Sequence, residues 1–152
     1  MPEGKVLAFG AFDLLHPGHL FYLKKAKKLG SELVVVVARD KTIEAEKGHA
    51  PVQSEKERLQ IVNALKPVDR AILGEKGENR LSVIAKEMPE VIALGHDHKI
   101  KKKAIEAYLA EQGLSCKIVR LPAFRRKKFK SSLARKKICR GKDELGLDMM
   151  SF

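Results

Sequence analysis

The stretch FGAFDLLHPGHLFYLKKAKKLG, residues 9–30, contains the change from strand to helix that decides the fold. Residues 5–9 form a short apolar run that ends at Gly10, which is typical of a buried strand. Apolar residues at 20, 23, 26 and 29 follow at helical spacing with lysines between them, and Gly30 is a typical helix stop. The stretch therefore predicts a strand that passes almost directly into a helix.

The rest of the chain continues this alternation. Apolar runs predict strands over residues 32–38, 70–73, 91–94 and 117–121, and helices are predicted over residues 54–65, 79–87 and 100–112. Ser54 and Glu57 form a capping-box pattern, and residues 39–53 are expected to be a charged loop. The alternation with short connections predicts an α/β fold: a Rossmann-like, doubly wound parallel sheet of about five strands with helices on both faces.

The net charge of +12 is concentrated near the C-terminus. Residues 124–142, FRRKKFKSSLARKKICRGK, contain ten Lys or Arg residues and no acidic residue, whereas the remainder contains 21 basic and 19 acidic residues. Such clusters attract phosphate-bearing partners, including nucleotides, nucleic acids and membranes. We expect a core domain over residues 1–123 and a basic C-terminal segment over 124–152; the sequence does not decide whether residues 143–152 are ordered.

A length of 152 residues suits one domain, and we expect no membrane partner, since the basic cluster alone does not select one among phosphate-bearing partners. The longest apolar run without glycine, residues 33–38, is far too short to span a bilayer, and the N-terminal MPEGKV lacks a secretory pattern. We therefore expect a cytoplasmic protein. In that reducing compartment Cys116 and Cys139, which are far apart in sequence, are expected to be free thiols.

His16 and His19 lie where the first strand passes into the helix. Pro17 suits the first helical turn, Gly18 permits close approach of a ligand, and histidines three residues apart lie on the same side of that turn. Because a helix N-terminus presents unpaired N–H groups, the arrangement predicts a phosphate site. Two alternatives remain: capping or packing histidines, and a zinc site completed by the histidines of residues 95–98.

Polar residues follow two of the predicted strands, at residues 10–13 and 95–98. In doubly wound sheets, ligands bind at the carboxyl ends of the strands, near the switch in strand order. Both segments therefore point to one crevice.

The segment GAFDLLHPGH, residues 10–19, resembles the G-T-F-D-x-x-H-x-G-H signature of the HxGH-type nucleotidyltransferases, the cytidylyltransferase-like superfamily. VVVVARD is similar to the second strand of that superfamily, EKERLQIVNALKPVDRAILG to its arginine-bearing helix and third strand, and VIALGHD to its fourth strand. The resemblance covers roughly residues 5–121, with a weaker match beyond them. Within the superfamily the chain most resembles the archaeal FAD synthetases, which transfer AMP from ATP to FMN.

The resemblance implies attack of an acceptor phosphate oxygen on the α-phosphorus of ATP, with release of pyrophosphate and no covalent histidyl intermediate. It implies that His16 and His19 are catalytic, binding the triphosphate and stabilising the transition state. Mg²⁺ or another divalent cation is expected with ATP. The implied nucleotide-binding residues are Ala11, Phe12, His16, Pro17, Gly18, His19, Asp97, Phe124, Ser131 and Ser132. Those implied for the acceptor or its phosphate are Asp13, Lys47 and Arg58.

Four of these residues have a structural alternative in the core domain. Asp13 could orient its loop, help to hold a metal ion or act as a charge at a helix N-terminus. Asp97 could be a turn aspartate. Lys47 and Arg58 could be exposed surface charges.

The basic C-terminal segment has similar alternatives. FKSSLARKKI occupies the place of the superfamily's serine/threonine-rich phosphate loop, so the resemblance implies that this segment completes the triphosphate site. Ser131 or Ser132 could instead cap a terminal helix, and Phe124 could stack on a base or flavin ring or simply pack.

The sequence departs from the superfamily at Ala11, where threonine is usual, and at His96 and His98, where the FAD synthetases tend to have tyrosine and glutamine. The alternative function is a cytidylyltransferase acting on glycerol 3-phosphate or a similar phosphorylated alcohol. A second alternative is a non-enzymatic nucleic-acid-binding domain, which would explain the basic segment but has no recognisable binding motif. Because members of the superfamily are often dimers, a homodimer is also considered.

Overall fold

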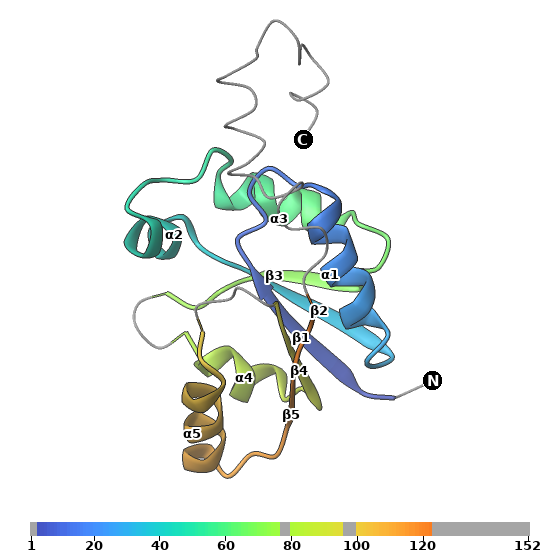
Figure 1. The fold of residues 1–152 in the computed structure, drawn as a ribbon. Coiled ribbons are helices and arrows are strands. Elements are labelled where there is room, and N and C mark those ends of the chain that lie inside the picture. The colour runs from blue at the N-terminus through green and yellow to red at the C-terminus, as the bar shows by residue number, and fades with distance from the viewer. Residues whose placement is uncertain (1–2, 77–79, 96–99, 123–152) are drawn as a thin grey trace, which may run out of the picture.

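Five strands form one fully parallel sheet in the spatial order β3-β2-β1-β4-β5 (Figure 1). The structure is a computed structural model, and it describes residues 3–76, 80–95 and 100–122. The strands are β1 (Lys5–Gly10), β2 (Glu32–Val37), β3 (Arg70–Leu73), β4 (Val91–Leu94) and β5 (Lys117–Arg120). The helices are α1 (Pro17–Lys27), α2 (Asp40–Lys47), α3 (Glu55–Asn63), α4 (Ser82–Glu87) and α5 (Lys102–Gln112). The predicted Rossmann-like fold is confirmed.

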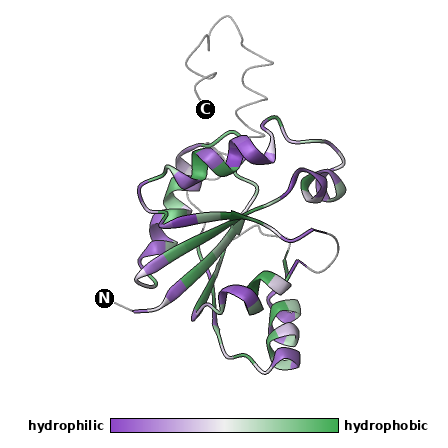
Figure 2. Cartoon of the chain, turned by 180° about the vertical axis from the view of Figure 1, so that it is seen from behind, coloured by the Kyte–Doolittle hydropathy of each residue, from purple (hydrophilic) through white to green (hydrophobic). Residues whose placement is uncertain are grey.

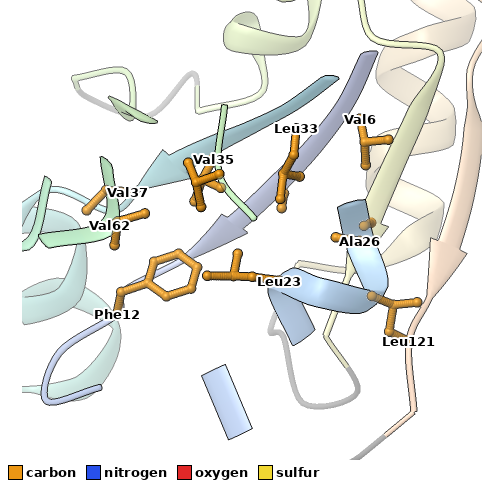
Figure 3. Packing of buried hydrophobic residues seen from close by; sticks show 12 residues of the cluster. Val6, Phe12, Leu23, Ala26, Leu33, Val35, Val37, Val62 and Leu121 are labelled. Carbon is orange, nitrogen blue, oxygen red and sulfur yellow. The ribbon is translucent and has the colours of Figure 1, made fainter. Parts of the chain in front are cut away.

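Each face of the sheet packs against its own layer of helices, because successive strand side chains point to opposite faces. The cluster on the α1 and α3 side contains Val6, Ala8, Phe12, Leu23, Ala26, Leu33, Val35, Val37, Val62, Val68, Ala93 and Leu121 (Figure 3). The cluster on the α4 and α5 side contains Leu7, Phe9, Val34, Val36, Val83, Ile84, Ile92, Leu94, Ile105 and Leu109. Figure 2 shows the hydrophobic colour running along the strands between the two layers. The sheet is therefore doubly wound, as predicted.

Residues 40–47 are helical, so the prediction of a loop over residues 39–53 is wrong for its first half. Helix α2 reads DKTIEAEK, and its apolar pattern is too sparse to predict a helix. Tertiary packing stabilises the helix that this pattern does not predict, because Ile43 is buried. Gly48 ends the helix with φ 79°, a left-handed conformation that favours glycine. The remaining loop is the short segment between Gly48 and Ser54.

The capping box at the start of α3 is confirmed. The Ser54 side chain accepts a hydrogen bond from Glu57 N, and the Glu57 carboxylate accepts one from Ser54 N, both at 3.2 Å. The two bonds satisfy main-chain donors that the first turn of a helix leaves unpaired. They fix the direction in which the chain enters α3.

The predicted division at residue 123 lies at the limit of the described residues. β5 ends at Arg120, and Leu121 packs into the cluster on the α1 and α3 side. Because residues 123–152 lie outside the described part, the two-part organisation stays a prediction, as does the free thiol of Cys139. Cys116 is a free thiol, and burial raises its pKa to about 11. No helix within residues 3–76, 80–95 and 100–122 has both the length and the apolar character needed to cross a bilayer.

Candidate active site

The carboxyl ends of β1 and β4 mark the switch point of the sheet, because the chain continues to β2 on one side of β1 and places β4 on the other. The last residues paired between these strands are Ala8 and Ala93. Beyond them Tyr22, on α1, joins the two main chains through its hydroxyl group. The hydroxyl donates to Ala93 O at 2.6 Å and accepts from Phe9 N at 3.2 Å. Helix α1 is thereby attached to both strands at the edge where ligands bind in such folds.

Burial favours the protonated, uncharged form of the Tyr22 hydroxyl. Burial raises its pKa far above the ordinary value, and the hydrogen bond from Phe9 N only partly opposes this. The group can therefore act as donor and acceptor at once.

Replacing Tyr22 by phenylalanine should lower the free energy of unfolding by about 1–2 kcal/mol, because one main-chain N–H and one carbonyl lose their shared partner. Urea denaturation measures this loss. The matched control is Tyr108→Phe on α5, where no comparable bridge occurs among the described residues. Equal stability of Tyr22→Phe and the parent would contradict the role assigned to the bridge.

His16 and His19 form a reciprocal capping box at the N-terminus of α1. His16 is the N-cap residue, and its Nδ1 accepts a hydrogen bond from Gly18 N at 3.1 Å. Nδ1 of His19 accepts from His16 N, also at 3.1 Å. Pro17 occupies the first helical position, where its missing N–H costs nothing. The two ring centroids are 4.0 Å apart.

This capping box determines the tautomer of both neutral rings. A nitrogen that accepts a main-chain N–H carries no proton, so in a neutral ring the proton is on Nε2, which is then the donor atom. The capping alternative and the phosphate-site prediction are therefore compatible, since the rings cap through Nδ1 and can donate through Nε2. Beside the positive end of the helix dipole, such donors favour an anion.

The zinc alternative receives no support from the described residues. They contain no group of three or more His, Cys, Asp and Glu side chains that could hold a metal ion. His96 and His98, which the alternative requires, lie outside the described residues.

The loop before the histidines is held in an unusual conformation by the core. Phe12 and Leu14 have φ values of 55° and 56°, in the left-handed region that non-glycine residues rarely adopt. The ring of Phe12 is almost fully buried and lies 5.7 Å from the ring of His19. Figure 3 shows Phe12 beside Leu23 of α1. Packing of this ring offsets the cost of the strained backbone, which is about 1–2 kcal/mol per residue.

Asp13 fastens the same loop to the segment between α2 and α3. Its two carboxylate oxygens accept hydrogen bonds from Val52 N at 2.8 Å and Gln53 N at 2.9 Å. The side chain of Gln53 in turn accepts from Leu14 N at 3.2 Å. Of the alternatives considered for Asp13, this geometry supports orientation of the loop.

Arg58 is completely buried, so the alternative that it is an exposed surface charge is wrong. Its guanidinium contacts three main-chain carbonyls and the carboxylate of Asp40. A side chain with no accessible surface is not an exposed surface charge. The geometry supports a structural role for Arg58, and contact with the acceptor phosphate stays a prediction.

The structure thus brings together Ala11, Phe12, Asp13, His16, Pro17, Gly18, His19 and Arg58. Lys47 is exposed at the end of α2, at the start of the segment that Asp13 contacts. Asp97, Phe124, Ser131 and Ser132 lie outside the described residues. Sequence reasoning missed Tyr22 and Gln53. Tyr22 lies three residues after His19, and this helical spacing could have indicated that Tyr22 belongs to the same site.

The chain is similar in sequence to a known family and to several known proteins. A family described as cytidylyltransferase-like matches residues 7–137. The FAD synthase of Aciduliprofundum boonei is 47% identical over 79% of this chain and 79% of its own length. The FAD synthase of Thermoplasma acidophilum is 43% identical over 88% of this chain and 93% of its own length.

Solved structures show the same fold. A crystal structure described as the lipopolysaccharide core biosynthesis protein from Thermoplasma volcanium superposes with a TM-score of 0.75, at 43% identity, over 79% of this chain and 97% of that one. Pantothenate synthetase from Thermus thermophilus superposes with a TM-score of 0.53 over 81% of this chain and 57% of its own. At 16% identity, the second similarity concerns the fold alone.

Proposed function

Because the chain belongs to the cytidylyltransferase-like family, we propose that it is a nucleotidyltransferase that transfers AMP from ATP to the phosphate of FMN, giving FAD and pyrophosphate. Relatives named FAD synthase at 40–47% identity over most of the chain support the flavin as acceptor. The observation that carries the proposal is the histidine capping box at the switch point of the sheet. It offers two Nε2–H donors and a helix N-terminus to a triphosphate.

In the proposed reaction, an oxygen of the FMN phosphate forms a bond to the α-phosphorus of ATP as the bond from that phosphorus to the bridging oxygen of pyrophosphate breaks. Negative charge grows on the departing pyrophosphate and on the oxygens around the α-phosphorus. His16 and His19 donate hydrogen bonds to these oxygens, and the dipole of α1 favours the same charge. Positioning and electrostatic stabilisation suffice, because phosphoryl chemistry of this kind needs no covalent protein intermediate.

The other site residues retain the roles implied by the resemblance, as parts of the proposal. The main chain of Ala11 and Phe12 lies against the nucleotide, and Asp97 contacts it at the end of β4. Lys47 binds the acceptor phosphate. The basic segment after residue 123 completes the triphosphate site with Ser131 and Ser132, and Phe124 stacks on a ring of a substrate.

A divalent cation fits the proposed site as a companion of ATP rather than as a resident ion. Magnesium usually keeps several waters and binds through substrate phosphates, so it needs no protein cage. Both carboxylate oxygens of Asp13 already accept main-chain N–H groups. When bound with ATP, magnesium neutralises part of the phosphate charge. The proposal places the enzyme in the cytoplasm, with ATP and FMN as its partners, and leaves a homodimer open.

The test is a comparison of four substrate pairs with the purified full-length protein and Mg²⁺. ATP or CTP is combined with FMN or glycerol 3-phosphate, and both pyrophosphate and the nucleotidylated acceptor are measured. We expect FAD from ATP and FMN only. Product only from CTP and glycerol 3-phosphate would retain the family mechanism but contradict the flavin assignment. Pyrophosphate release with none of the pairs would contradict the proposal for these acceptors.

A further inference from the structure

Arg58 is a charged side chain with no accessible surface, in a part of the chain where charges are otherwise at least partly exposed. Burial of a charge is costly unless its hydrogen-bond donors and its charge are matched. Arg58 meets both conditions. Nε donates to Gln53 O at 3.0 Å, Nη1 donates to Ala11 O at 2.8 Å and Ala38 O at 2.6 Å, and Nη2 donates to Asp40 Oδ1 at 2.7 Å.

The three carbonyls belong to three segments that meet at the carboxyl edge of the sheet. Ala11 opens the loop that leads to the histidines, and Ala38 directly follows β2. Gln53 belongs to the segment before α3, which Asp13 also contacts. One guanidinium therefore holds together the main chains on which the candidate site is built.

The contact at Ala11 determines the path of the histidine loop, residues 11–15, which connects β1 to His16. Ala11 immediately precedes Phe12, the first of the two residues with left-handed backbone. On the other side of Ala11, Gly10 O accepts a hydrogen bond from Ala38 N at 2.9 Å. The loop is thus fixed at its first peptide groups before it turns toward His16.

We infer that Arg58 is a positioning residue for nucleotidyl transfer: by holding the main chain of Ala11 against β2 and the segment before α3, it places His16 and His19 in the geometry that the reaction needs. The inference rests on the proposed function. Arg58 touches no substrate in this assignment and acts through the histidine loop. Its planar fork of donors is essential, because the three carbonyls and the carboxylate lie around different edges of the guanidinium.

Asp40 is the charge partner of Arg58 and offers a milder way to disturb it. Its side chain is about one-third exposed, at 37%, and it lies in the first turn of α2. Asp40→Asn removes the negative charge but retains an oxygen that can accept the hydrogen bond. The guanidinium then remains buried with a weaker partner.

The principal test is Arg58→Lys in the full-length protein. Lysine keeps the charge but has a single nitrogen, which cannot reach all four acceptors. We expect kcat for FAD formation to fall about 10- to 100-fold at a temperature well below the melting temperature, because small displacements of reacting groups have effects of this size. Affinity for ATP, measured by calorimetry without FMN, should fall as well.

A spectroscopic measurement reports on the histidines directly. Two-bond ¹H–¹⁵N correlations of the five histidines identify the tautomer of each ring. We expect the signals of His16 and His19 to shift in Arg58→Lys and, to a smaller extent, in Asp40→Asn. Asp40→Asn should lower kcat several-fold, and it provides the test by all the same measurements if Arg58→Lys does not fold.

The matched control is Arg39→Lys. Arg39 lies at the end of β2, and it also donates to one carbonyl, Gly74 O, and one carboxylate, that of Glu55. It has no hydrogen bond to the histidine loop among the described contacts. We expect a lower melting temperature for Arg39→Lys, with kcat, ATP affinity and histidine signals close to those of the parent.

Two outcomes would overturn the inference. A lower melting temperature of Arg58→Lys with unchanged kcat, ATP affinity and histidine signals would make Arg58 a residue of stability alone. If only the KM for FMN increased and the other quantities were unchanged, the result would indicate that Arg58 contacts the acceptor directly. Absence of FAD formation by the parent protein would instead contradict the proposed function, and ATP affinity and the histidine signals would then still decide the role of Arg58.

Discussion

Replacing His16 by asparagine should reduce FAD formation about 100- to 1000-fold while leaving the fold and its stability nearly unchanged. The oxygen of asparagine can accept the hydrogen bond from Gly18 N, so the cap of α1 is retained. Asparagine lacks the ring whose Nε2–H donates to the triphosphate. The expected loss of kcat is that of one donor to a transition-state oxygen. Steady-state kinetics and thermal denaturation of the same preparation measure the two effects.

The control for this prediction is His16→Ala, which removes both the cap and the ring. It should lose as much activity as His16→Asn and, in addition, about 1 kcal/mol of stability. If His16→Asn retained the activity of the parent, His16 would be a cap without a catalytic role. The pair of variants therefore separates the two functions that the structure assigns to one side chain.

Replacing Gly10 by alanine should lower both the stability of the protein and the rate of FAD formation. A Cβ at Gly10 would lie 2.6 Å from Cε2 and 2.7 Å from Cζ of Phe12. The ring is buried in the core cluster, so we expect the methyl group to cost about 1–3 kcal/mol of stability. Displacement of Phe12 also moves the loop before His16, and kcat should fall about 10-fold or more.

Gly74→Ala is the matched control, because Gly74 follows β3 at the same edge of the sheet. A Cβ there would make ordinary contacts, at 3.5 Å from Cγ1 of Val36 and 3.6 Å from Val37 O. We expect activity close to that of the parent and little change in denaturation. Similar losses in both variants would show that the effect of Gly10→Ala comes from the strand end in general and not from contact with Phe12.

The architecture and the location of the site could be predicted from the sequence because they depend on local patterns. Unbroken apolar runs such as residues 33–37 are typical of strands buried on both faces, and alternation with helices then leaves few topologies. The Ser54–Glu57 capping box and the His16–His19 segment are likewise local, since each involves residues three positions apart. The resemblance to the family rests on the same local segments.

Helix α2 and the buried Arg58 could not be predicted in this way. Ile43 of α2 is buried in the folded protein, which a sparse apolar pattern does not reveal. An arginine on an amphipathic helix is usually exposed, and only the three carbonyls and the Asp40 carboxylate that meet around Arg58 make its burial favourable. The bonds of Tyr22 to β1 and β4, and of Asp13 to residues 52 and 53, also join segments that are far apart in sequence.

The sequence by itself determined the parallel α/β sheet, the edge at which ligands bind and the histidines that lie there, because strand and helix periods and caps act over a few residues. Only the tertiary structure decided how that edge is held: which nitrogen of each imidazole caps the helix, why Phe12 tolerates a left-handed backbone, and that Arg58 is buried against three main-chain carbonyls and Asp40. These features depend on hydrogen bonds and packing between distant segments, whose distances are set only when the sheet and both helix layers have assembled.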